Sequence, residues 1–97
     1  MPFEIILAPE AAAALKALPA RVRATVRDGL EAHLRHEPAR VSRSRIKRLN
    51  GLRQPQYRLR IGEVRIFYDI VASTVEILAI VAKSEAERWL RQFGEPA

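Results

Sequence analysis

The sequence predicts an α+β domain in which a small, mainly antiparallel, twisted sheet carries two N-terminal helices and a C-terminal helix. Two helical patterns follow a short β-rich run near the start, four strand patterns occupy residues 45–82, and a last helical pattern follows them. The expected element order is therefore β-α-α-β-β-β-β-α. With 97 residues we expect one domain over 1–97, enough for a single modest core.

The N-terminal elements are separated by prolines. Residues 3–8 form a β-rich run that stops at Pro9, which suits the first position of a helix extending to Leu18. Pro19 ends this helix, and a second one is expected from Ala20 to Glu37 before Pro38. The buried stripe of the first helix should comprise Ala11, Ala14, Leu15 and Leu18. That of the second should comprise Val22, Val26, Leu30 and either His33 or Leu34.

The second half of the chain contains the expected strands. A linker through Ser44 leads to a short strand over 45–49, an Asn50-Gly51 turn and a hairpin. The strand over 74–82 is nearly all apolar, which predicts a central position in the sheet. Residues 84–87, Ser-Glu-Ala-Glu, have the spacing of a capping box that opens a C-terminal helix with Trp89, Leu90 and Phe93.

The hairpin over 57–70 is the most informative segment. Gly62-Glu63 is a plausible two-residue turn, since glycine supplies the positive φ that a type II′ turn requires. The register that follows pairs Ile61 with Val64, Arg60 with Arg65, Leu59 with Ile66, Arg58 with Phe67, and Tyr57 with Tyr68. One face is then apolar and the other cationic. Directly opposed arginines repel each other unless an anion or separate acids compensate them, and a phosphate is the obvious candidate.

The charge distribution also points to an anionic partner. Nine of the 17 lysines and arginines lie between residues 40 and 65, where Glu63 is the only acid, although the whole chain carries a net charge of +6. Such a concentration is typical of a nucleic-acid surface, while an ordinary solvated basic surface is the alternative. The candidate nucleic-acid-binding residues in this segment are Arg43, Arg45, Lys47, Arg48 and Arg53.

Several classes of site are not expected. Without cysteine there is no disulfide, thiolate zinc site or cysteine nucleophile. Asp69 and Glu76 could be neighbours across the last two strands but lack a third ligand, so solvation or pairing to arginine is expected instead of a metal site. We expect no cofactor and no membrane segment, and hence a cytoplasmic protein. His33 and His36 lie on the second helix, away from the hairpin, and are interpreted as structural.

Aromatic residues of the hairpin divide between its two faces. Tyr57 and Tyr68 fall on the apolar face and are expected in the core. Phe67 shares the cationic face with Arg58, where it is a candidate for stacking a nucleobase. Burial under the C-terminal helix is the alternative for Phe67.

The chain resembles the RelE/ParE superfamily of bacterial toxins from type II toxin-antitoxin modules. The element order carries the resemblance, together with the phrases Leu15-Lys16-Ala17-Leu18-Pro19 and Ile46-Lys47-Arg48-Leu49-Asn50-Gly51-Leu52. Its most specific part is Tyr57-Arg58-Leu59-Arg60-Ile61-Gly62-Glu63-Val64-Arg65-Ile66-Phe67-Tyr68. The resemblance extends from Phe3 to about Leu90.

This resemblance implies a small toxin that a cognate antitoxin neutralises. One branch of the superfamily cleaves messenger RNA in the ribosomal A site without a metal, and the other poisons DNA gyrase. Of the two, the ribosome-dependent endoribonuclease is the function we expect, with a gyrase inhibitor or a non-toxic nucleic-acid-binding module as alternatives. The positions that match the basic residues of the nuclease cleft are Arg58, Arg60, Arg65 and Lys83.

One departure from the nuclease pattern lies near the C-terminus. Where many nuclease members have a tyrosine, this chain has Trp89 and Leu90, and neither side chain can exchange a proton near neutral pH. RNA cleavage requires a base, cations that stabilise the phosphorane, and an acid. Arg60 and Arg65 suit the cationic role, since arginine stays protonated. Lys83 could transfer protons if it were desolvated among the arginines.

Overall fold

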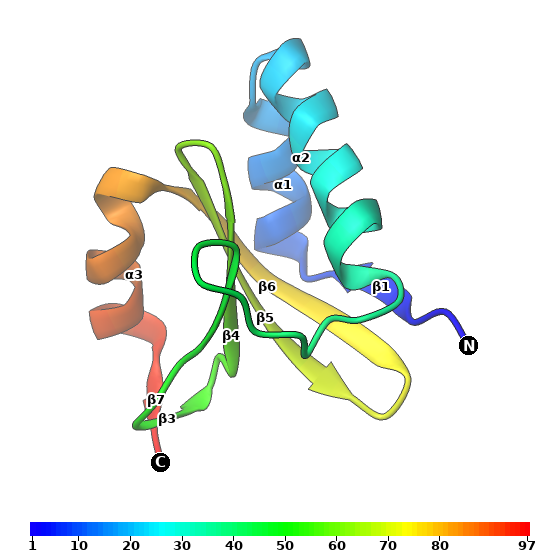
Figure 1. The fold of residues 1–97 in the computed structure, drawn as a ribbon. Helices are drawn as coiled ribbons and strands as arrows, with labels where there is room; N and C mark the ends of the chain where they lie inside the picture. The colour runs from blue at the N-terminus through cyan, green and yellow to red at the C-terminus, as the bar shows by residue number, and fades with distance from the viewer.

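The computed structural model describes all residues 1–97 and has the predicted α+β architecture (Figure 1). The helices are α1 (Pro9–Ala17), α2 (Ala20–Leu34) and α3 (Ala86–Phe93), with a 3₁₀ turn η1 over Lys83–Glu85. The strands are β1 (Glu4–Leu7), β2 (Ile46–Arg48), β3 (Leu52–Gln54), β4 (Tyr57–Ile61), β5 (Val64–Val71), β6 (Thr74–Ala82) and β7 (Glu95–Pro96). None of the helices is both long enough and apolar enough to cross a membrane.

Five strands form the main sheet, in the order β1-β6-β5-β4-β2. Strand β1 runs parallel to β6, and the other neighbours are antiparallel. The interior position predicted for the apolar strand β6 is confirmed. Helices α1 and α2 lie on one side of the sheet and α3 on the other (Figure 1). The small sheet of β3 and β7 was not predicted, because a three-residue and a two-residue strand give no periodic signal.

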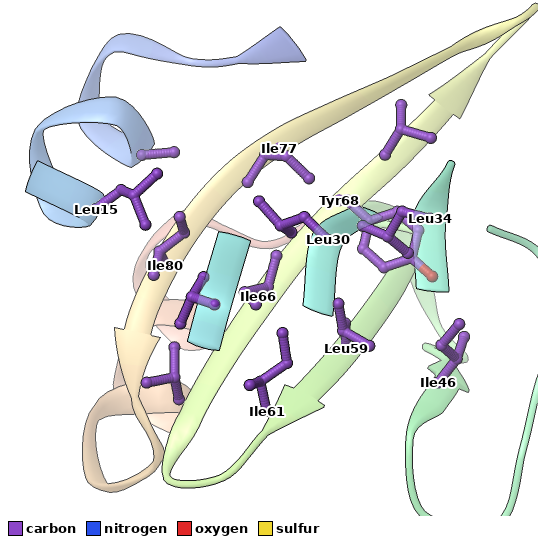
Figure 2. Packing of buried hydrophobic residues seen from close by; sticks show 14 residues of the cluster. Leu15, Leu30, Leu34, Ile46, Leu59, Ile61, Ile66, Tyr68, Ile77 and Ile80 are labelled. Carbon is purple, nitrogen blue, oxygen red and sulfur yellow. The ribbon is translucent and has the colours of Figure 1, made fainter. Parts of the chain in front are cut away.

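The core fills the space between the sheet and the helical pair α1–α2 (Figure 2). Its helical side includes Leu15, Val26, Leu30 and Leu34, which pack over Leu59, Ile66, Tyr68 and Ile77 of the sheet. Gly29 marks a close approach of α2 to β4, since a Cβ atom there would lie 2.2 Å from Ile61 Cδ1. Val22 was predicted to be buried but is exposed, because it lies in the first turn of α2, beyond the area that the sheet covers.

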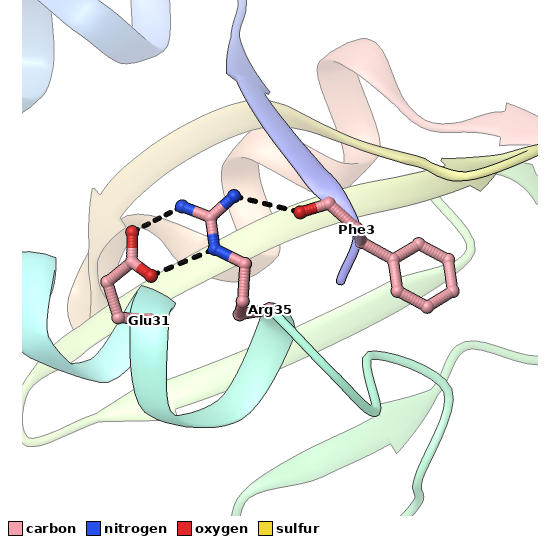
Figure 3. A network of polar contacts seen from close by, with 3 residues as sticks. All are labelled: Phe3, Glu31 and Arg35. Carbon is pink, nitrogen blue, oxygen red and sulfur yellow. Dashed lines mark hydrogen bonds and ion pairs between the residues drawn. The ribbon is translucent and has the colours of Figure 1, made fainter. Parts of the chain in front are cut away.

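Helix α2 ends at Leu34, three residues before the predicted end. Pro38 has no N–H, so it cannot donate to the Leu34 carbonyl and continue the helix. The Arg35 carbonyl instead accepts a hydrogen bond from the Phe3 N–H at 2.7 Å. The Arg35 guanidinium donates to the Phe3 carbonyl at 2.8 Å and to both carboxylate oxygens of Glu31 (Figure 3). These contacts fasten the end of α2 to the start of β1.

The predicted capping box at Ser84 is wrong. Ser84 lies inside η1, Glu85 occupies the N-cap position of α3, and no side chain caps this helix. The Lys83 N–H donates to the Glu63 carbonyl, and this contact with the hairpin turn holds residues 83–85 outside the α-helix. Helix α3 buries no residue completely, and β7 behind it pairs with β3.

Candidate nucleic-acid interface

The hairpin has the predicted register. Gly62 has a φ of +57° in the turn, and the pairs Ile61–Val64, Arg60–Arg65, Leu59–Ile66, Arg58–Phe67 and Tyr57–Tyr68 are all present. Leu59, Ile61 and Ile66 belong to the core. The alternation of strand side chains therefore places Arg58, Arg60 and Arg65 on the opposite face, away from α1 and α2.

These three residues form what we call the arginine cluster (Arg58, Arg60 and Arg65). Burial lowers the pKa of the Arg58 guanidinium, and the positive charges of Arg65 and Arg60 lower this pKa further. None of the three forms an ion pair with a carboxylate. The Nε atoms of Arg58 and Arg60 are buried and have no hydrogen-bond partner. A partly desolvated group of cations without a counter-charge favours an anion bound by the guanidinium groups.

Arg65 differs from the other two members of the cluster. The residue is only 8% exposed, and its Nη1 donates to the Gly62 carbonyl at 2.9 Å and to the Val64 carbonyl at 3.1 Å. Arg65 therefore also closes the hairpin turn. This structural role could not be foreseen from its position opposite Arg60.

The two faces of the hairpin hold different aromatic pairs. Tyr57 and Tyr68 stack on the helical side with ring centroids 5.4 Å apart, which confirms their predicted place in the core. Phe67 is 1% exposed and stacks on Trp89 of α3, with centroids 5.0 Å apart and planes 5° apart. The alternative expectation for Phe67, burial under α3, is therefore confirmed. Its ring is not available to stack on a nucleobase.

Lys83 lies beside the turn of the hairpin. Its side chain is exposed and lines a shallow pocket together with Glu63 and Ser84. The condition of desolvation among arginines is therefore not met for Lys83. Trp89 is held between Phe67 and Phe93, so α3 presents no proton-transfer group at this position.

Comparison with known proteins decides the family. A family model described as "ParE toxin of type II toxin-antitoxin system, parDE" matches residues 5–87. The chain belongs to this ParE toxin family. A search of curated proteins found no significant match.

Solved structures of RelE toxins are similar to this ParE-family toxin. The RelBE2 toxin-antitoxin complex of Mycobacterium tuberculosis has 28% sequence identity and a TM-score of 0.66, covering 84% of this chain and 99% of that one. The archaeal RelE-RelB complex from Pyrococcus horikoshii has 24% identity and a TM-score of 0.64, covering 86% and 97%. A mutant of the Escherichia coli toxin RelE in the free state has 17% identity and a TM-score of 0.68, covering 96% and 99%.

The basic residues of the toxin that precede the hairpin fall into two groups. Lys47 and Arg43 are exposed, whereas the guanidinium groups of Arg45, Arg48 and Arg53 each contact another part of the chain. Lys47 pairs with Arg58 in the register of β2 and β4, so this exposed side chain extends the arginine cluster towards the edge of the sheet. The guanidinium of Arg45 donates to the Arg60 carbonyl, and that of Arg48 donates to the Gln56 carbonyl and lies over the ring of Tyr57. Arg53 pairs with Glu95 at 2.6 Å. Arg43 is exposed in the loop before β2.

Two further predictions need correction in this ParE-family toxin. Asp69 and Glu76 are neighbours as predicted, but Asp69 is neither solvated nor paired to arginine. Its buried carboxylate accepts hydrogen bonds from Gln54 Nε2 and the Gln56 N–H, both at 2.7 Å, and so fixes the loop before β4. His33 and His36 line a polar pocket with two arginines. His36 was predicted to lie on the second helix, but α2 ends at Leu34, so His36 lies in the loop that follows it.

Proposed function

We propose that this toxin is a ribosome-dependent endoribonuclease that cleaves messenger RNA without a metal ion. The observation that supports it is the arginine cluster, whose three guanidinium groups converge without a carboxylate and leave two buried Nε donors unused. The planar fork of arginine matches the oxygens of a phosphate, and a phosphodiester supplies the missing acceptors.

In this proposal the arginine cluster binds the scissile phosphate and stabilises the charge that develops on the phosphorane. Preorganised donors at such a position act mainly on the transition state, because the charge on the non-bridging oxygens increases there. Lys83 and Glu63 share the pocket beside the turn, and both are exposed groups that can carry a proton. Because Lys83 is exposed, we assign it the role of the acid, in which its ammonium group gives a proton to the departing 5′ oxygen, with Glu63 as its neighbour across the pocket.

A gyrase inhibitor is the second candidate. Arg58, Arg60, Arg65 and Phe67 occupy the cationic face without a histidine, tyrosine or free carboxyl group, and Trp89 stands where nuclease members have a tyrosine. A toxin that only binds its target requires no proton-transfer group. The matching family model is also that of ParE toxins.

We also propose that a cognate antitoxin binds this toxin. Two of the solved structures described above are toxin-antitoxin complexes, RelBE2 of Mycobacterium tuberculosis and RelE-RelB of Pyrococcus horikoshii. An antitoxin that binds only the folded toxin stabilises it by mass action. The melting temperature of the toxin should therefore rise with antitoxin concentration, and an unchanged value with a tight-binding antitoxin would contradict the proposal.

The decisive experiment applies two assays to the purified wild-type toxin. One is primer extension on messenger RNA in translating ribosomes, and the other is DNA supercoiling by gyrase. The proposal predicts new messenger ends that depend on the ribosome, with supercoiling unaffected. Blocked supercoiling without messenger cleavage would instead identify a gyrase inhibitor, and no effect in either assay would favour a nucleic-acid-binding module without toxicity.

A further inference from the structure

A second cationic pocket lies at the C-terminal end of α2, beside the edge strand β2. Its polar lining consists of His33, His36, Glu37, Arg40, Ser42 and Arg45. Two arginines and two imidazoles thus surround one hydroxyl and one carboxylate. The excess of positive charge increases further when the histidines are protonated.

The loop that forms the floor of this pocket is well organised. Ser42 Oγ accepts hydrogen bonds from the backbone N–H groups of Arg45 at 3.0 Å and Ile46 at 3.1 Å. The Arg45 guanidinium is oriented by its hydrogen bond to the Arg60 carbonyl at 3.1 Å, which occupies only one of its five N–H groups. Arg45 is therefore positioned before any ligand binds.

The single acid of the pocket holds its partner weakly. Arg40 and Glu37 approach to 3.5 Å, and their side chains are 76% and 65% exposed. Exposed pairs of this kind contribute about 0–1 kcal/mol, so an anion can replace Glu37 as the partner of Arg40. Removing the Glu37 charge should then favour anion binding.

The two histidines of the pocket lie close to several charged groups. Burial lowers the pKa of His33, and the positive charge of Arg45 lowers it further. His36 is exposed, and its charge is felt by Glu31, which is already bound to Arg35. The charged groups that face the two histidines are thus Glu31, Glu37, Arg40 and Arg45. An anion in the pocket would oppose the effect of Arg45 and raise the pKa of His33.

We propose that this pocket binds a second phosphate of the same RNA strand whose scissile phosphate lies on the arginine cluster. The inference rests on the proposed function for its choice of RNA. The pocket and the cluster adjoin, because Arg45 and Arg60 exchange hydrogen bonds across β2 and β4. Strand β2 is the edge of the sheet, and exposed Lys47 lies on it opposite Arg58. A strand of RNA that passes around this edge can therefore contact basic side chains along its whole path from the pocket to the arginine cluster.

The first test titrates inorganic phosphate into the free toxin and follows the ring signals of His33 and His36 by NMR. We expect phosphate to raise the pKa of His33, to shift the ring signals of His36, and to bind more weakly as pH rises through the His33 pKa. Arg40→Ala should weaken binding severalfold, Glu37→Gln should strengthen it, and Arg21→Ala, an exposed arginine at the other end of α2, should leave it unchanged. Ring signals of His33 and His36 that do not respond to phosphate would overturn the inference, as would equal weakening by all three substitutions.

The second test asks whether one strand reaches both sites. A 2′-deoxy hexanucleotide lacks the attacking hydroxyl, so it binds without cleavage. It should perturb the signals of His33 and His36 together with those of Arg58 and Arg60, whereas a dinucleotide should perturb only one set. If the hexanucleotide perturbs only the signals of the arginine cluster, although inorganic phosphate binds in the pocket, the inference that one strand occupies both sites is wrong. A wild-type toxin that fails to cleave messenger would remove the proposed function, yet the phosphate titration would still decide whether the pocket binds anions.

Discussion

Arg60 and Arg65 stand directly opposite each other in the β4–β5 hairpin, and neither pairs with a carboxylate. The two differ in their remaining contacts. Arg65 donates to two carbonyls of the turn, whereas Arg60 has a buried Nε with no partner. Arg65 therefore stabilises the hairpin turn, whereas the guanidinium of Arg60 has no structural contact of this kind.

The first prediction follows from this difference. Arg60→Ala should leave the free energy of unfolding unchanged or slightly higher, since it removes like-charge repulsion without breaking a bond. Arg65→Ala should lower it by about 1–3 kcal/mol, because hydrogen bonds from a charged donor to the turn are lost. Denaturant unfolding of both variants and wild type measures the difference. Equal stabilities of the two variants would show that the turn contacts of Arg65 contribute nothing.

The second prediction concerns the salt dependence of binding to single-stranded RNA. Lys47→Ala should reduce the slope of log affinity against log salt by about 0.7, the value expected for one phosphate contact in a single strand. Arg53→Ala is the matched control, because Arg53 pairs with Glu95 and should leave the slope unchanged. A larger change from Arg53 than from Lys47 would place the binding surface on the β3 side of the molecule.

The hairpin could be predicted in full because its alternation, glycine turn and apolar face all specify the same register. The turn contacts of Arg65 could not, since they depend on how a long side chain folds back onto the carbonyls of Gly62 and Val64. The capping box failed for a related reason: a backbone hydrogen bond from Lys83 to Glu63 overrides the local preference of Ser84. Tertiary contacts between segments distant in sequence are invisible to spacing alone.

The candidate site was predicted in part. Sequence placed Arg58, Arg60 and Arg65 together correctly, because strand parity fixes which side chains share a face. The sequence did not distinguish Lys47, which is exposed, from Arg45 and Arg48, whose guanidinium groups donate hydrogen bonds to backbone carbonyls. It also missed the pocket of His33 and His36, which exists only because the loop after α2 brings Arg40 and Arg45 beside them.

The third prediction concerns alkaline pH. Burial raises the pKa of the Tyr68 hydroxyl above its ordinary value, and the neighbouring Tyr57 raises it further. An unfolded tyrosine loses its proton near pH 10, so the folded state holds more protons above that pH. Stability is therefore fully present below about pH 10 and falls as pH rises beyond it.

Tyr68→Phe tests this dependence. The variant should lose about 1–2 kcal/mol at neutral pH, since it removes the hydrogen bond from the Tyr68 hydroxyl to the Pro38 carbonyl at 2.6 Å. Its stability should also decline less steeply than that of wild type above pH 10. Parallel declines in denaturant unfolding across this pH range would show that the folded state does not hold the Tyr68 proton.

The central claim is that the arginine cluster binds the scissile phosphate, and single-turnover cleavage of ribosome-bound messenger by Arg60→Ala tests it most directly. Arg60 is the best position, because its loss should not disturb the fold, and Arg21→Ala provides an exposed control of the same charge change. We predict that Arg60→Ala lowers the cleavage rate on the order of a hundredfold or more, as the loss of one transition-state donor does, with stability and the Arg21→Ala rate unchanged. A rate for Arg60→Ala equal to that of wild type would contradict the account.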